Sequence, residues 1–95
     1  MIIVHDIFVC KPGNASKLAK LFKEWADIKK NTYVMTDMTG QFHRVIIATN
    51  YDSLADYEVE SQKMGETAEE RALMEKFKDM NEMYVSGSRE IYKVW

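Results

Sequence analysis

The sequence predicts an α+β fold of the ferredoxin-like type, with elements in the order βαββαβ and one antiparallel sheet. Two segments rich in β-branched residues, 1–10 and 42–51, are each followed by a helical pattern. A short extended segment precedes a turn at Gly40, and the closing "SREIYKVW" provides a last strand. We expect the 95 residues to form one domain, 1–95.

The first strand, "MIIVHDIFVC", ends at Pro12 and Gly13, and Asn14 or Ser16 is suited to cap the helix that follows. The Lys-Pro-Gly corner lacks the several glycines and the Lys-Ser/Thr pair of a phosphate-binding loop, so we interpret it as a simple turn. Apolar residues then recur at intervals of three and four, which predicts an amphipathic helix with the buried face Leu18, Leu21, Phe22, Trp25 and Ile28.

The segments "TYVMTDM" and "FHRVIIATNY" predict an antiparallel hairpin around Gly40. In the third strand, as in the first, apolar residues occupy both alternating sets of positions. A sheet that is apolar on both faces is covered on both faces, and two helices cover only one. The sequence therefore predicts that a second copy of the chain covers the other face.

The second helical region starts at Asp52 or Ser53 and is weakened at Gly65. Thr67 and Glu70 form a second capping signature, so the helix is expected to restart there. We expect its buried face to be Leu73, Phe77, Met80 and Tyr84, with Gly87 as the C-terminal cap. Trp25 and Phe77 are predicted to lie in the helix–sheet core and not to contact a ligand.

The composition and charge of the chain argue against several classes of protein. The chain is 46% apolar with a net charge of −2, and its single cysteine excludes an internal disulfide. The N-terminus does not resemble a signal peptide, and no stretch approaches the ~20 apolar residues of a membrane span, so we expect a cytoplasmic protein without a membrane partner. The lysine-rich first helix and the acidic second one complement each other, so no nucleic-acid partner is expected. No cysteine–histidine cluster is present, and we expect no metal and no cofactor.

Three stretches carry a resemblance to a known superfamily. They are "FVCKPGNASKLAKLF", "VIIATNYDSLADYE" and "SGSREIYKVW", and the resemblance covers nearly the whole chain. They resemble the dimeric α/β-barrel superfamily, and within it the small antibiotic-biosynthesis-monooxygenase-like and NIPSNAP-like domains. The resemblance implies a homodimer whose two sheets face each other and enclose a cavity. The Asn, Trp and His of the haem-degrading branch have no counterparts here, which argues against haem oxidation.

Two alternative sets of residues are candidates for a pocket on the partner-facing side of the sheet. Asp6 and Arg44 are charges within apolar strands and need partners or water, and Glu90 and Tyr92 on the last strand are placed to join them. The competing pair is His5 and His43, which strand alternation puts on the faces opposite Asp6 and Arg44. Cys10 is expected to be an inert small residue, and no catalytic residue is identified.

The function predicted from these observations is a homodimer that binds a small apolar or aromatic molecule between the sheets. The alternative is a cofactor-independent monooxygenase or isomerase of the antibiotic-biosynthesis-monooxygenase type, and a pure interaction module is a third hypothesis. The sequence leaves open whether the protein is an enzyme.

Overall fold

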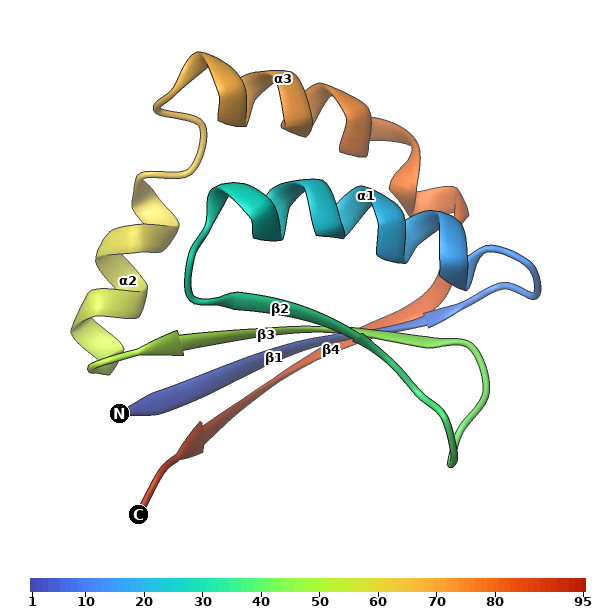
Figure 1. The fold of residues 1–95 in the computed structure, drawn as a ribbon, viewed down its shortest axis with the longest axis horizontal. Coiled ribbons are helices and arrows are strands. Elements are labelled where there is room, and N and C mark those ends of the chain that lie inside the picture. The colour runs from blue at the N-terminus through green and yellow to red at the C-terminus, as the bar shows by residue number, and fades with distance from the viewer.

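The computed structural model describes residues 1–95 and has the predicted α+β architecture (Figure 1). The elements are β1 (Ile2–Cys10), α1 (Ala15–Ile28), β2 (Thr32–Thr36), β3 (Arg44–Tyr51), α2 (Leu54–Gln62), α3 (Ala68–Lys76), the 3-10 helix η1 (Phe77–Glu82) and β4 (Tyr84–Lys93). The four strands form one sheet in the order β2-β3-β1-β4, and every neighbouring pair is antiparallel. None of the helices is long and apolar enough to cross a membrane.

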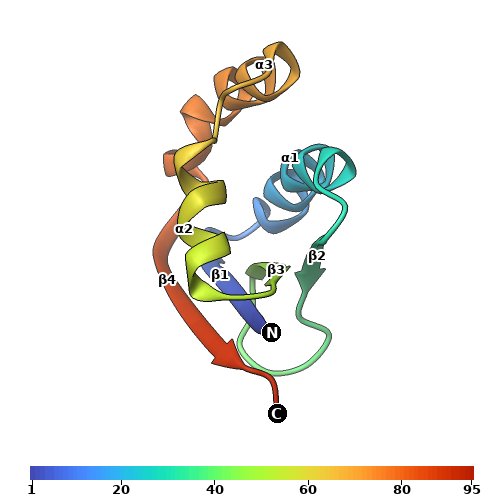
Figure 2. The same ribbon diagram turned by 90° about the vertical axis from the view of Figure 1, so that its left-hand side faces the viewer.

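The helices gather on one side of the sheet, and the other side is open (Figures 1 and 2). The helix α1 lies directly on β2 and β3, and α3 packs on α1 and not on the sheet. The core between α1 and the sheet is built around Cys10, Leu18, Phe22 and Val45. Only ten of the 95 residues are buried, so the chain alone has the thin core expected at this length.

The alternation of β1 assigns its residues to the two faces. Val4 and Cys10 are buried, and the ring of Phe8 lies 5.2 Å from that of Phe22 on α1, so the even-numbered residues face the helices. The odd-numbered residues of β1 and their partners on β2 and β3 form the open face, which carries the apolar side chains Ile3, Ile7, Val9, Tyr33, Met35 and Ile46. All six are at least partly exposed in the single chain.

The predicted start of the second helical region and its predicted restart are both present. The Ser53 hydroxyl accepts a hydrogen bond from the Asp56 backbone N–H at 3.2 Å, and the Thr67 hydroxyl accepts one from the Glu70 N–H at 3.0 Å. Between the two helices Gly65 has a φ of +87°, a left-handed conformation that interrupts the helix. No residue of α2 is buried, and α2 is held mainly by Tyr57, whose ring packs against Tyr51 of β3.

Two predictions about the C-terminal third are wrong. The last helix does not continue to Tyr84, because α3 ends at Lys76, the 3-10 helix η1 follows, and Tyr84 already belongs to β4. Gly87 is not a helix cap: it lies within β4 opposite Phe8, close to the Phe8 ring. At the start of α1, Asn14 occupies the cap position, but its side chain makes no capping hydrogen bond.

Candidate functional site

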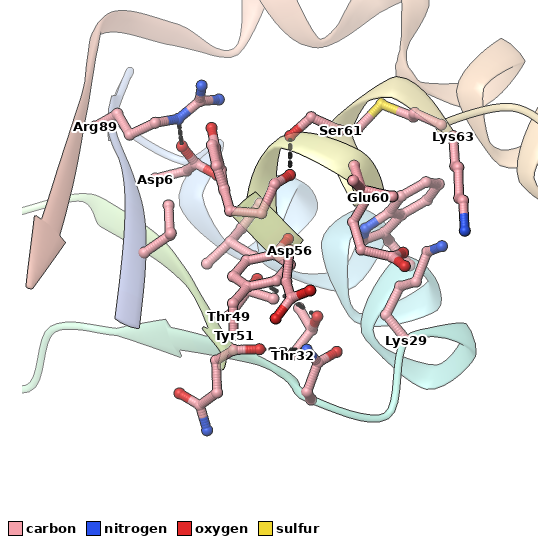
Figure 3. Close-up of a pocket in the computed structure, with 18 of the residues that line it drawn as sticks. Asp6, Lys29, Thr32, Thr49, Tyr51, Asp56, Glu60, Ser61, Lys63 and Arg89 are labelled. Carbon is pink, nitrogen blue, oxygen red and sulfur yellow. Dashed lines mark hydrogen bonds and ion pairs between the residues drawn. The ribbon is translucent and has the colours of Figure 1, made fainter. Parts of the chain in front are cut away.

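A cavity of about 870 Å³ lies between α2 and the helix-covered side of the sheet (Figure 3). It exists because α1 and α3 stack on each other over β2 and β3, which leaves the space beside them to the loosely packed α2. Residues from β1, β3, β4, α1 and α2 line it. The cavity therefore lies within one chain and not between two sheets.

The apolar wall of the cavity consists mainly of aromatic rings. Phe22 and Trp25 of α1 pack against Phe77, with centroid distances of 5.7 and 6.0 Å. On the other side, the rings of Tyr51 and Tyr57 meet edge to face at 5.3 Å. Trp25 and Phe77 both belong to the helix packing, as predicted, and both also line the cavity. That they do not contact a ligand stays a prediction.

At one end of the cavity, Asp6 of β1 lies beside Arg89 of β4, which is its directly paired residue across the two strands. The Arg89 Nε donates a hydrogen bond to the Asp6 Oδ1 at 2.5 Å. The guanidinium carbon of Arg89 lies 5.8 Å from the centroid of the Tyr57 ring, a cation–π contact that connects β4 to α2. Hydrogen bonding to Asp6 raises the pKa of Arg89 further above its usual value.

Tyr51 connects this polar end to the aromatic wall. Burial raises the pKa of its hydroxyl, and the neighbouring Tyr57, Glu60 and Asp6 raise it further. The Tyr51 hydroxyl is therefore neutral at physiological pH and can donate a hydrogen bond to a ligand.

The floor and the far end of the cavity supply further polar groups. The hydroxyls of Thr32 and Thr49, from neighbouring strands, lie 3.4 Å apart on the floor. Figure 3 shows Lys29 and Lys63 at the end remote from Arg89. The ammonium of Lys29 lies 5.3 Å from the Trp25 ring centroid. Three exposed carboxylates line the rim: Asp52, just before α2, and Asp56 and Glu60 within α2.

The structure separates the four residues of the first candidate set. Asp6 faces the helices and lines the cavity, because it shares the alternation of Val4 and Phe8. Arg44, which pairs with Val9, lies on the open face, as do Glu90 and Tyr92, which pair with His5 and Ile3. The expectation that the charged strand residues point away from the helices is therefore wrong for Asp6.

The three remaining members of that set are spread over the open face. The Tyr92 hydroxyl and the Glu90 carboxylate are hydrogen-bonded to each other, which raises the pKa of Tyr92. The Arg44 Nε is buried and has no hydrogen-bond partner within the chain. Its backbone N–H donates to the Asp37 carboxylate at 2.8 Å.

The competing histidines are not brought together. His5 lies on the open face with its ring 5.2 Å from that of Tyr92, and its partner on β3 is Ala48. His43 precedes β3 by one residue and has a φ of +64°, with its ring beside Phe42. Ala48 lies five positions after His43, which separates the two histidines by roughly 16 Å along the sheet, at about 3.3 Å per residue.

Sequence reasoning missed Arg89 as a cavity residue. The sequence did contain an indication of this contact. Asp6 in the first strand and Arg89 in the last carry opposite charges, and these strands neighbour each other in this topology. The pairing of Asp6 with Arg89, however, depends on the register of β1 and β4, which the sequence does not specify.

The residues present favour neither a metal site nor a reactive thiol. No three His, Cys, Asp or Glu side chains converge closely enough to hold a metal ion. Cys10 is buried, and burial raises the pKa of its thiol, which disfavours the reactive thiolate.

No protein-family model matches the chain, and no curated protein matches it. Solved structures do share its fold. A NIPSNAP domain protein from Burkholderia xenovorans is similar with a TM-score of 0.77 at 10% identity, covering 100% of this chain and 95% of that chain. A NIPSNAP family protein from Agrobacterium tumefaciens has a TM-score of 0.74 at 20% identity, covering 97% of this chain and 90% of that chain.

A third similar structure is an antibiotic biosynthesis monooxygenase, with a TM-score of 0.69 at 11% identity over 100% of this chain and 99% of that chain. These similarities confirm the fold that the resemblance in the sequence predicted. At such low identities they do not identify the activity or the ligand of this chain.

Proposed function

We propose that this protein binds a small, largely aromatic or apolar molecule in the cavity between α2 and the sheet. The single observation that carries the proposal is the cavity of about 870 Å³. Ligand sites are typically concave, about 300–1,000 Å³ in volume, and mostly apolar with a few placed polar groups. Five aromatic rings and the Asp6–Arg89 pair match that description.

The proposal moves the ligand from the space between two sheets to a space within each chain. The reason is the packing of the helices: α2 has no buried residue, so the cavity under it is not filled by the chain itself. Three large apolar side chains of the α2 region, Leu54, Val59 and Met64, are more than 45% exposed. A bound aromatic molecule would give Val59 and Met64, which line the cavity, an apolar surface to pack against.

The neutral fluorophore N-phenyl-1-naphthylamine tests the proposal, because its emission rises when it enters an apolar site. We expect saturable binding to the full chain. The substitution Val59→Trp should abolish it, because Val59 lines the cavity from an exposed helix and an indole there occupies the ligand's space. Gln62→Trp is the matched control, because Gln62 is exposed on the same helix and does not line the cavity.

Binding that is unaffected by Val59→Trp would overturn the proposed location. Absence of saturable binding to the unaltered chain at micromolar concentrations would count against the binding function itself. Circular dichroism of each variant checks that the helix content is retained.

The second part of the proposal is that two copies associate through the open face of the sheet. It is supported by the apolar side chains of β1, β2 and β3 on that face and by the small number of buried residues. In such a dimer the cavity of each copy stays accessible, because α2, which lines it, lies on the side of the sheet opposite the open face (Figure 2).

Catalysis of the cofactor-independent monooxygenase or isomerase type is the second candidate function. The fold shared with an antibiotic biosynthesis monooxygenase favours it, as does the aromatic cavity. Oxygen consumption with dithranol, an anthrone that ionises readily, tests the oxygenase reaction, with Val59→Trp as the blocked control. Uptake no faster than in buffer would contradict oxygenase activity on this class of compound, and the binding function would stand.

A further inference from the structure

The Asp6–Arg89 pair leaves hydrogen-bonding groups unused at the end of the cavity. The guanidinium donates through Nε to the Asp6 Oδ1, and neither of its Nη atoms has a partner in the chain. The second oxygen of Asp6, Oδ2, also has no hydrogen-bond partner. One side chain thus offers free donors and the other a free acceptor, side by side.

The geometry of this pair is restrained on several sides. The two residues are directly opposite each other on β1 and β4, so the strand pairing holds their backbones in place. The Arg89 guanidinium is additionally in contact with the face of Tyr57. Asp6 is about three-quarters buried, whereas the Arg89 side chain is 58% exposed, and both side chains line the cavity (Figure 3).

The charge of the surroundings argues against an anionic ligand group here. Asp6 neutralises Arg89, so the pair as a whole carries no net charge. Glu60 on α2 also lines the cavity, and its carboxylate, like that of Asp6, raises the pKa of Tyr51. A carboxylate placed against Arg89 would therefore lie beside the carboxylate of Asp6 and be repelled by it.

We propose that Asp6 and Arg89 recognise a neutral ligand group that has a carbonyl oxygen beside an N–H or O–H. The Nη groups of Arg89 donate to the carbonyl oxygen, and the Asp6 Oδ2 accepts from the adjacent N–H or O–H. The aromatic part of the ligand lies against Trp25, Phe77 and Tyr51. This inference rests on the proposed function, and it names the chemical class of ligand: an aromatic amide or hydroxy-carbonyl compound.

Displacement of N-phenyl-1-naphthylamine by three related compounds tests the inference. The compounds are 2-naphthamide, its N,N-dimethyl derivative and 2-naphthoate, which present a carbonyl with N–H, a carbonyl alone and an anion. We expect 2-naphthamide to bind about tenfold more tightly than either of the others, because only it satisfies both side chains without adding charge.

The substitution Asp6→Asn sharpens the test. Asparagine keeps an oxygen for the Arg89 Nε but presents an NH₂ donor where the free acceptor was. The preference should therefore reverse, with 2-naphthoate binding more tightly than 2-naphthamide. Glu58→Gln, which removes one charge from the exposed side of α2 outside the cavity, should leave the preference unchanged.

Tighter binding of 2-naphthoate than of 2-naphthamide to the unaltered chain overturns the inference and leaves the proposed binding function intact. An unchanged preference in a folded Asp6→Asn variant also overturns the inference and leaves the proposed binding function intact. If the fluorophore itself fails to bind the unaltered chain, the proposed function and this inference fail together. If Asp6→Asn does not fold, the order of the three compounds on the unaltered chain decides alone.

Discussion

The Glu70 side chain lies buried where the end of α1, the Gly65 turn and the start of α3 meet. Its carboxylate accepts hydrogen bonds from the Lys29 Nζ and the Gly65 N–H, both at 3.3 Å, and from the Thr67 hydroxyl at 3.1 Å. Burial by itself would raise the pKa of Glu70, but the hydrogen bonds from Lys29, Gly65 and Thr67 lower it below its usual value. The residue therefore stabilises the fold in its ionised form.

We predict that Glu70→Gln lowers the free energy of unfolding at pH 7 by about 1–3 kcal/mol, because it removes charge-assisted hydrogen bonds. The pKa of Glu70 is lower in the folded chain, so its stabilisation is present above the unfolded value of about 4.3 and is lost as the pH falls through the folded value. Urea unfolding at pH 7 and at pH 3 measures this. The difference between variant and parent should shrink at pH 3.

Glu69→Gln is the control for this prediction, because Glu69 is exposed on the same first turn of α3. It should change the stability by less than about 0.5 kcal/mol. Equal losses for Glu69→Gln and Glu70→Gln would show that the dipole of α3, and not the buried contacts, is responsible.

At the scale of elements, the separation of α2 from α3 gives the cavity its wall. Gly65 turns the chain in a left-handed conformation, and Thr67 then caps a new helix with a different direction (Figure 1). A continuous helix would carry residues 54–76 past the sheet in a straight line. The interruption lets α2 stand over the end of the sheet while α3 packs on α1.

We predict that Gly65→Ala destabilises the chain more than Gly13→Ala does. Both glycines have a φ above +80°, so each substitution adds about 1–2 kcal/mol of backbone strain. A Cβ at Gly65 would also lie 3.2 Å from the Met74 Sδ, whereas one at Gly13 would meet no atom within 4 Å. Thermal unfolding of both variants measures the difference, and an equal loss would contradict the role of Met74.

The elements up to Gly65 could be predicted from sequence, because each has a local signal: β-branched runs, a stripe of period 3.6 and capping residues. The end of α3 could not be predicted from the sequence. Phe77, Met80 and Tyr84 recur at helical spacing and all pack on the core cluster. A three-residue interval is also the repeat of a 3-10 helix, so the pattern from Phe77 to Met80 fits η1 equally well.

At the scale of the whole molecule, the sequence predicted that the helices leave one face of the sheet open, but not which residues lie on that face or where the cavity lies. Two-sided apolar strands indicated a second covered face, a property of composition alone. The cavity depends on how α2 and α3 divide the remaining face, and its polar end depends on the register of β1 against β4. Both are tertiary features without a local sequence signal.

We predict that the chain is a homodimer at micromolar concentration and that Ile46→Glu converts it to a folded monomer. Ile46 lies on the open face of a central strand, between Ile7 of β1 and Met35 of β2. An interface over this face should bury on the order of 2,000 Å² in total, as stable homodimers do. A glutamate at its centre would be buried without a partner in the dimer but hydrated in the monomer, which favours dissociation.

Light scattering after size exclusion gives the mass, and circular dichroism confirms that the variant is folded. Lys20→Glu, on an exposed position of α1, should remain dimeric. A monomeric mass for the unaltered chain, or a dimeric one for Ile46→Glu, would mean that the open face is not where two copies meet.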